Sequence, residues 1–320
     1  MFRSIFIYLS KAAWARKIVT GWKFAWRAAS RFVAGEKLED AIVVVKKLND
    51  KGINATLDHL GEHTTNAEEA LRATQDVLRM FDAIEQSNVR SNVSIKLTQL
   101  GLAVDEDLCI ENLRCILERA RQAGSYVRID MEDSPWVDKT LEMYRKVRFE
   151  HGLENFGVVI QAYLYRSEQD ILRLREECTG VRLCKGAYKE PPDVAFPKKK
   201  DLDTNFDHLA RLLIDGALQR GCPELSENGK IPPPPVLATH DPRRILNAKS
   251  YAQQIGLPKR AMEFQMLNGI RRNLQESLAA EGYPVRIYVP YGTEWYPYYV
   301  RRLAERPANL WFFVSNFFRP

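Results

Sequence analysis

The chain has 320 residues, of which 45% are hydrophobic, 28% charged and 10% aromatic, and its formal net charge is +6 at pH 7. This composition is typical of a globular protein with a sizeable core, and no apolar stretch approaches the roughly 18 to 20 residues that a membrane-spanning helix needs. The five cysteines are odd in number and contain no CxxC pair, so we expect neither a disulfide framework nor a metal site, and a cytoplasmic location.

The first 34 residues hold much of the positive charge and no acidic residue. Apolar side chains recur there at spacings of three or four, at Ile18, Trp22, Trp26, Ala29 and Val33. This pattern predicts that residues 1–35 form a basic amphipathic helical segment. Its apolar face either packs on the folded body or contacts the inner face of an anionic membrane, and both alternatives stay open. We expect no nucleic-acid partner, because the rest of the chain shows no basic stripe with stacking aromatics.

Residues 36–320 alternate short apolar runs rich in β-branched residues with longer segments of helical period. The eight predicted strands are Asn54–His59, Asn92–Leu97, Tyr126–Met131, Phe156–Gln161, Gly180–Cys184, Pro235–Thr239, Met262–Leu267 and Val285–Val289. Helices are predicted over Glu106–Ala123 and Ser167–Glu177, the second with Ser167 as its N-cap. Strands that alternate with helices pair in parallel, and closure of such a sheet produces a (βα)8 TIM-type barrel. An open doubly wound sheet has the same local pattern and is the alternative α/β fold.

A polar residue stands at the C-terminal end of almost every predicted strand. These residues are Asp58, Lys96, Asp130, Gln161, Lys185, His240, Gln265 and Tyr288. A single polar strand end commonly faces solvent or caps the next helix. In a barrel, however, all these ends share one rim, where barrel enzymes do their chemistry. Eight polar ends in register therefore predict a functional site at this rim.

The candidate rim carries more cations than acids. Its basic residues are Lys96, Arg182, Lys185, Arg301 and Arg302, and its acids are Asp130 and Glu305. Such a rim suits an anionic substrate or cofactor. Adjacent arginines on a helix point about 100° apart, but the long side chains of Arg301 and Arg302 can still converge on one carboxylate. The alternative is a solvated helix end in which Glu305 pairs with Arg301.

Two other chemistries fit parts of the sequence. Residues 59–63 read HLGEH, the H-x-x-E-H pattern of some zinc peptidases, but Gly61 breaks the helix that this mechanism requires. A lysine at a strand end, Lys96 or Lys185, could form a Schiff base as in barrel aldolases. No GxGxxG or Walker A motif is present, so a dinucleotide would lie on the loops at the barrel mouth, where Gly186 permits close backbone approach.

Several motifs resemble those of monofunctional bacterial proline dehydrogenases, and the resemblance runs from about residue 32 to the C-terminus. The segments that carry it are FVAGE (32–36), SIKLTQLG (94–101), RIDMED (128–133), VIQAYLYR (159–166), RLCKGAYKEP (182–191), ATHD (238–241), FQMLNGIR (264–271) and YVPYGTEWYPYYVRRLAERPAN (288–309). The most specific are the RLCKGAY segment and the last one. Cys184, Asp241 and Asn268 depart from the commoner family pattern, which leaves the affinity for the cofactor open.

The resemblance implies a distorted (βα)8 barrel with N-terminal helices that binds FAD non-covalently and oxidises L-proline to Δ1-pyrroline-5-carboxylate, with a membrane quinone as electron acceptor. It implies that Asp130 and Arg182 are catalytic groups near the site of hydride transfer. The implied substrate-binding residues are Lys96, Leu183, Tyr188, Tyr288, Tyr298, Arg301 and Arg302. The implied FAD-binding residues are Met131, Gln161, Lys185, Gly186, Ala187, Thr239, His240 and Glu305. A non-enzymatic FAD-containing sensor or scaffold is the second class of function, although no segment resembles a DNA-binding module.

Overall fold

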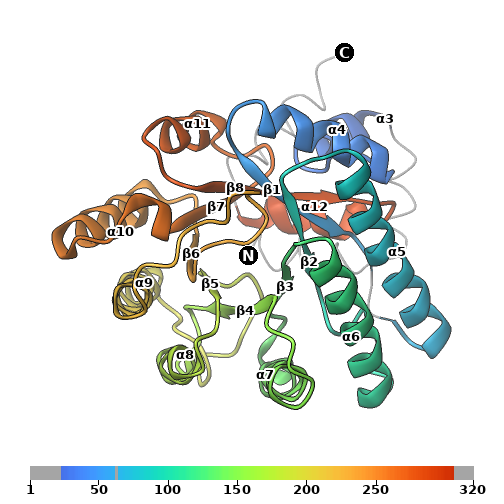
Figure 1. The fold of residues 1–320 in the computed structure, drawn as a ribbon, viewed down its shortest axis with the longest axis horizontal. Helices are drawn as coiled ribbons and strands as arrows, with labels where there is room; N and C mark the ends of the chain where they lie inside the picture. The colour runs from blue at the N-terminus through green and yellow to red at the C-terminus, as the bar shows by residue number, and fades with distance from the viewer. Residues whose placement is uncertain (1–22, 62–63, 306–320) are drawn as a thin grey trace.

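Eight parallel strands close into a barrel in the computed structural model of the chain, which describes residues 23–61 and 64–305 (Figure 1). The strands are β1 (Asn54–His59), β2 (Ser91–Ile95), β3 (Val127–Ile129), β4 (Phe156–Gln161), β5 (Val181–Cys184), β6 (Pro235–Ala238), β7 (Glu263–Leu267) and β8 (Val285–Tyr291). Each strand pairs with the next in sequence, and β8 pairs with β1. The predicted (βα)8 barrel is therefore confirmed, and the open doubly wound sheet is excluded.

Helices surround the barrel between successive strands. They are α5 (Ala67–Gln86), α6 (Glu106–Gln122), α7 (Val137–Arg145), α8 (Ser167–Glu176), α9 (Lys199–Gln219), α10 (Pro242–Ile255) and α11 (Arg272–Ala280). Three short helical segments lie between these elements. They are η1 (Ser134–Trp136), which precedes α7, η2 (Lys146–Glu150), which follows α7, and η3 (Lys259–Ala261), which precedes β7. None of the helices in the described part of the chain is long and apolar enough to cross a membrane.

The N-cap predicted for α8 was wrong. Arg166 is the N-cap residue, and Ser167 is the first residue of the helix. The Ser167 hydroxyl donates instead to the carbonyl oxygen of Gln161, at 2.6 Å. It therefore ties the start of α8 back to the end of β4 rather than occupying the N-cap position.

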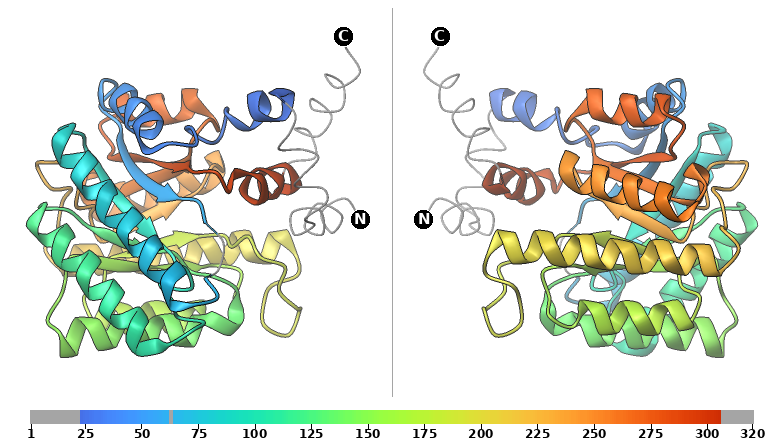
Figure 2. Two further views of the ribbon diagram at one scale, coloured as in Figure 1. Left: turned by 90° about the vertical axis from the view of Figure 1, so that its right-hand side faces the viewer. Right: turned by 90° about the vertical axis from the view of Figure 1, so that its left-hand side faces the viewer.

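The outer face of β8 and β1 is covered by a helix that precedes the barrel in sequence. Helix α4 (Leu38–Asn49) packs on both strands. The helix that follows β8, α12 (Trp295–Glu305), lies instead beside α3 (Lys23–Ala29). Figure 2 shows α3 and α12 together at the end of the barrel toward which the strand arrows point. The eighth helix of the barrel is thus placed at the mouth, where its side chains can reach the strand ends.

A separate hydrophobic cluster fixes α12 in this position. Its buried members are Ala29, Phe32, Val33, Leu60, Trp295, Tyr296, Tyr298, Tyr299 and Val300. The ring of Trp26 meets that of Trp295 edge to face, with centroids 5.3 Å apart. The backbone between α3 and α4 is also anchored, because Ala34 N donates to Pro290 O at 2.9 Å. The apolar stripe predicted for the N-terminal segment therefore packs on α12 where it is described, while Ile18 and Trp22 lie outside the described residues.

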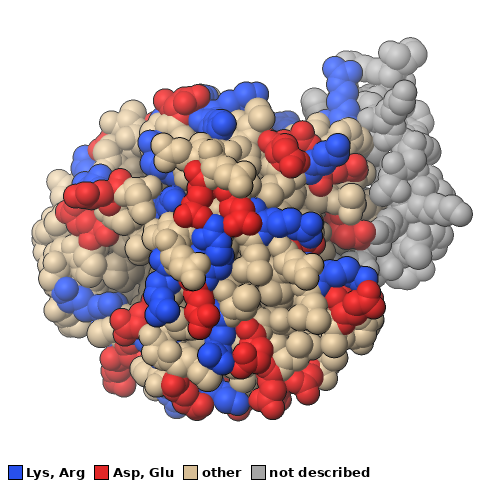
Figure 3. Space-filling view, turned by 45° about the vertical axis from the view of Figure 1, so that its right-hand side comes forward, with Lys and Arg blue, Asp and Glu red and all other residues tan. Residues whose placement is uncertain are grey.

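The barrel interior is polar, and its N-terminal end is closed. Arg286 and Glu263 form a fully buried ion pair at 2.9 Å. Arg286 also donates to Gly229 O at 2.8 Å, and Asn92 donates to Lys230 O at 3.0 Å. The loop before β6 thus plugs this end of the barrel. The open end is the other one, at the C-terminal ends of the strands. On the face shown in Figure 3, basic and acidic side chains are intermixed.

Candidate active site

Asp130 is the centre of a charged network at the mouth. One of its carboxylate oxygens accepts from Arg182 Nη1 at 2.7 Å, and the other accepts from the Tyr288 hydroxyl at 2.7 Å. Lys96 Nζ lies 3.2 Å from Asp58 Oδ1 and 4.0 Å from Asp130 Oδ2. The five residues come from or directly follow β1, β2, β3, β5 and β8. Closure of the barrel therefore brings together groups that are far apart in sequence.

The network keeps its lysine charged and its tyrosines protonated. Burial alone would lower the pKa of Lys96, but Asp58 and Asp130 outweigh it and raise that pKa above its ordinary value of 10.5. Burial raises the pKa of Tyr188 to about 12 and raises the pKa of Tyr288 as well. The site thus presents a fixed ammonium group and two phenol hydroxyls at neutral pH.

Helix α12 carries two adjacent arginines, Arg301 and Arg302. Arg301 is exposed to solvent over much of its surface, but the protein around its guanidinium, and then the charge of Arg302, lower its pKa. Tyr188 and Asp58 are among the groups that act on Arg301 electrostatically, so both lie within electrostatic reach of its guanidinium. The guanidinium of Arg302 lies 5.2 Å from the ring centroid of buried Tyr298. Glu305 ends α12, but its side chain lies outside the described part of the structure, so its predicted roles are untested.

Two buried polar atoms at the mouth have no hydrogen-bond partner among the described residues. They are Oε1 of Gln161 and Nε of Arg182, on the neighbouring strands β4 and β5. Gln161 Nε2 donates to Met131 O at 3.3 Å, and Arg182 Nη2 donates to Ser94 Oγ at 3.1 Å, so both side chains are held in place. An acceptor and a donor left open on neighbouring strands fit the polar edge of a bound planar cofactor, because buried polar atoms are rarely left unpaired.

The other residues assigned to cofactor binding lie along the same rim. Gly186 has φ +100°, and a Cβ there would overlap the ring of Tyr163, so only glycine fits. His240 Nε2 accepts from Leu267 N at 2.9 Å, and Thr239 Oγ1 accepts from Asp241 N at 3.1 Å. Ala187 is exposed on the loop after Gly186.

Lys185 and Leu183 differ in their surroundings from the rest of the assigned residues. Lys185 bonds Asp203 on α9 and lies 3.1 Å from Asp241, the N-cap of α10. The aspartate that departs from the family pattern at position 241 therefore gives Lys185 a second carboxylate. Leu183 is fully buried in the main hydrophobic core rather than among the polar groups of the mouth.

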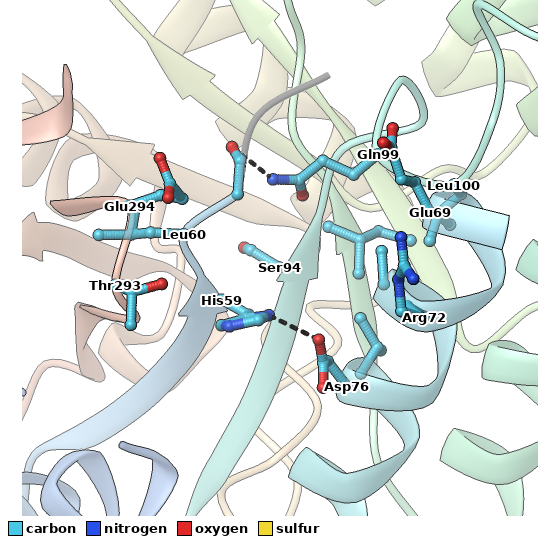
Figure 4. A pocket seen from close by; sticks show the side chains of 14 residues that line it. His59, Leu60, Glu69, Arg72, Asp76, Ser94, Gln99, Leu100, Thr293 and Glu294 are labelled. Atoms are coloured by element: carbon cyan, nitrogen blue, oxygen red, sulfur yellow. Dashed lines mark hydrogen bonds and ion pairs between the residues drawn. The ribbon is translucent and has the colours of Figure 1, made fainter. Parts of the chain in front are cut away.

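A cavity of about 200 Å³ lies beside the mouth, between β1, α5 and the turn after β8 (Figure 4). It contains His59, whose Nδ1 lies 3.5 Å from Asp76 and whose ring stacks on Tyr291. Within residues 23–61 and 64–305, no group of three or more His, Cys, Asp or Glu side chains could hold a metal ion. Glu62 and His63 of the H-x-x-E-H pattern lie outside the described residues. His59 itself serves to join β1 to α5.

Sequence reasoning missed three residues of this region. Asp58 was recognised as a strand end but given no role, although it is the nearest partner of Lys96. Ser94 binds Arg182, and Glu132 accepts from the Thr98 hydroxyl at 2.7 Å. The signal for Ser94 was the strand period of two, which puts it on the same face as Lys96. Glu132 lies beyond the end of β3, so no such signal pointed to it.

Comparisons with known proteins identify what this chain is similar to. A family model described as Proline dehydrogenase matches residues 41–314. The chain is 40% identical over 319 residues to Proline dehydrogenase 1 of Bacillus subtilis, covering 99% of both chains. It is 42% identical over 294 residues to the proline dehydrogenase of Deinococcus radiodurans, covering 91% of this chain and 90% of that one. A crystal structure of proline utilization A from Bdellovibrio bacteriovorus, inactivated by N-propargylglycine, has a TM-score of 0.79 at 26% identity, over 95% of this chain and 36% of that chain.

Proposed function

The chain belongs to the proline dehydrogenase family, and we propose that it oxidises L-proline to Δ1-pyrroline-5-carboxylate with a non-covalently bound FAD and passes the electrons to a quinone. The observation that carries the proposal is the network of Asp130, Arg182, Tyr288 and Lys96 at the mouth of the barrel. Its charges suit a small zwitterion, and the open acceptor of Gln161 and donor of Arg182 suit a flavin. When bound, FAD takes a hydride from the proline ring carbon beside the nitrogen.

The residues of the mouth bind and orient the substrate in this proposal. Arg301 and Arg302 hold the proline carboxylate, while the rings of Tyr188, Tyr288 and Tyr298 surround the pyrrolidine ring. Leu183 has the least support as part of this wall, because it is buried in the main core. Arg182 is held in place by Asp130 and Ser94, and it would supply a cation beside the FAD. A fixed cation there stabilises the negative charge that develops on reduction.

Met131, Gln161, Lys185, Gly186, Ala187, Thr239, His240 and Glu305 hold the FAD in this proposal. The rival Schiff-base reaction needs a neutral lysine. Lys96 is poorly suited to it, because its two aspartates raise its pKa. Lys185 is likewise paired with two aspartates.

A quinone acceptor resides in the membrane, and the basic N-terminal segment offers a means of reaching it. We place the protein in the cytoplasm, peripherally at the inner face of the membrane. The division into an N-terminal segment of residues 1–35 and a barrel domain of residues 36–320 is part of this proposal.

The test is spectroscopic. The purified protein should be yellow, should bleach on anaerobic addition of L-proline, and should reduce a quinone or an artificial dye. It should form no NADH when NAD⁺ and proline are supplied. A colourless protein that produces NADH from proline would overturn the proposal.

A further inference from the structure

Glu190 links three loops at the mouth of the barrel. It lies in the loop between β5 and α9, residues 185–198, which also carries Gly186 and Tyr188. Its Oε1 accepts from Ser134 N at 2.8 Å, and its Oε2 accepts from Ser134 Oγ at 2.6 Å. Ser134 follows β3, so this pair of bonds joins the β5 loop to the loop that begins just beyond Asp130.

The same carboxylate also holds the ring of Tyr163. The Tyr163 hydroxyl, in the loop after β4, donates to Glu190 Oε1 at 3.2 Å. Tyr163 is buried, and burial and then Glu190 raise its pKa, so the phenol keeps the proton that it donates. The ring lies directly against Gly186, where a side chain would overlap it. Glu190 therefore contacts Gly186 indirectly, through Tyr163.

Backbone hydrogen bonds anchor the two ends of this loop. At the start, Tyr163 N donates to Lys185 O at 3.1 Å. Toward the end, Phe196 N donates to Tyr163 O at 2.8 Å, and Tyr165 N donates to Val194 O at 3.1 Å. Tyr188 and Glu190 lie between these anchors. Pro191 follows Glu190 and lacks a backbone N–H, so this stretch has one donor fewer for backbone pairing.

We propose that Glu190 is a positioning residue for proline oxidation, because its carboxylate fixes the loop that places Tyr188 and the Gly186 backbone at the mouth. The inference rests on the proposed function in assigning Tyr188 to the substrate and Gly186 to the FAD. The three hydrogen bonds of Glu190 make the bound arrangement of this loop the dominant one before proline arrives.

Replacing Glu190 by alanine should therefore act mainly on KM. A substrate that binds only the ordered loop has its apparent dissociation constant raised by the factor by which the ordered population falls. Loss of charge-assisted hydrogen bonds of this kind changes the equilibrium constant for ordering the loop about 10- to 100-fold. We expect Glu190→Ala to raise the KM for proline by up to that factor, with kcat retained because saturating proline reorders the loop.

Conservative variants separate this role from general stability. Glu190→Gln keeps an acceptor for Ser134 N and Tyr163 and offers a donor to Ser134 Oγ, so it should restore most of the wild-type KM. Ser134→Ala removes one of the three bonds and should show an intermediate KM. The Ser134→Ala and Glu190→Ala changes should not be additive, because they remove the same contact. Asp193→Asn, on an exposed residue of the same loop, is the matched control for the loss of one negative charge.

Hydrogen–deuterium exchange tests the loop independently of activity, and the proteins are compared at equal FAD content, measured by absorbance. Backbone amides of residues 185–198 should exchange faster in Glu190→Ala than in wild type, Glu190→Gln and Asp193→Asn, while those of the barrel strands remain unchanged. Equal exchange and a KM within twofold of wild type in Glu190→Ala would overturn the proposal. If Glu190→Ala does not fold, Ser134→Ala decides alone by the same two measurements. Failure of the proposed function would instead appear as an inactive wild-type protein, with the exchange difference still present.

Discussion

The hydroxyl of Tyr288, near the end of β8, donates a 2.7 Å hydrogen bond to Asp130, which follows β3 on the opposite wall of the barrel. The guanidinium of Arg182 lies 5.7 Å from the centroid of the same tyrosine ring and binds the other oxygen of Asp130. Tyr288 is thus held at its hydroxyl and over its ring. A ring fixed in this way gives one wall of the mouth a defined shape.

We expect this wall to discriminate against hydroxylated substrates. Proline should be preferred over trans-4-hydroxyproline, because the ring of Tyr288 leaves the added hydroxyl without room or a partner. The preference should be about 10- to 100-fold in kcat/KM. Tyr288→Ser should narrow it, whereas Tyr288→Phe, which keeps the ring, should retain it. Equal kcat/KM for both substrates in the wild-type protein would contradict this role for Tyr288.

The arginine pair of α12 should control substrate affinity. Removing one partner of a desolvated carboxylate–guanidinium pair costs about 2 to 5 kcal/mol, or roughly 30- to several-thousand-fold in affinity. Arg301→Met and Arg302→Met should therefore raise the KM for proline strongly while FAD stays bound. Arg272→Met is a suitable control, because Arg271 and Arg272 are also adjacent and exposed, but at the start of α11. If both α12 variants keep a near wild-type KM, the pair is structural and does not bind substrate.

Lys96, which we propose to bind substrate, should also be required as the counter-charge of Asp58. The Asp58 side chain is only 2% exposed, so Lys96→Met leaves a buried carboxylate without its nearest cation. Breaking such a pair costs about 3 to 5 kcal/mol of folding stability. The double variant Lys96→Met/Asp58→Asn should recover most of that loss, because it removes the stranded charge as well. Urea unfolding of the wild type, Lys96→Met, Asp58→Asn and the double variant measures the coupling energy between the two residues. If the losses of folding stability in the single variants add up to the loss in the double variant, the pair does not stabilise the protein.

The pH dependence of these variants follows from the direction of the shifts. In the wild-type protein the pKa of Lys96 is raised, so the stability that it contributes is fully present below pH 10.5 and is lost only as pH rises through the folded-state value. Lys96→Met lacks this contribution, so its loss of stability relative to wild type should stay the same from about pH 6 to 9 and shrink only above about pH 10.5. A loss that already shrinks well below pH 10.5 would contradict the assignment.

Local sequence pattern predicted the barrel because each strand is a short β-rich run whose polar end lies at one rim. The bounds of β1 and β4 agree with the prediction to the residue. Tertiary packing decided what the pattern could not predict. Nothing local to α4 indicates that it covers β8 and β1 and so leaves α12 at the mouth. The requirement for glycine at position 186 likewise depends on the ring of Tyr163, 23 residues earlier in the chain.

The N-terminal segment should have two separable functions, divided near residue 22. Residues 26–33 pack on α12, since Trp26 contacts Trp295 and both Ala29 and Val33 are buried in the same hydrophobic cluster. Deleting residues 1–30 removes part of this support from the helix that carries Arg301, so the KM for proline should rise. Deleting only residues 1–22 should leave kcat and KM with a soluble dye unchanged but abolish salt-sensitive binding to anionic vesicles, because the remaining basic residues would lack an apolar face to insert.

Vesicle co-sedimentation at low and high salt, with neutral vesicles as the control, measures membrane binding. Steady-state kinetics of the two truncated proteins measure the KM for proline. The membrane proposal should be abandoned if the protein lacking residues 1–22 still binds anionic vesicles like the full chain. The supporting role of α3 should be abandoned if removal of residues 1–30 leaves the KM unchanged. Because only the longer deletion reaches Trp26 and Ala29, a rise in KM confined to it would assign the effect to packing on α12 rather than to loss of the membrane.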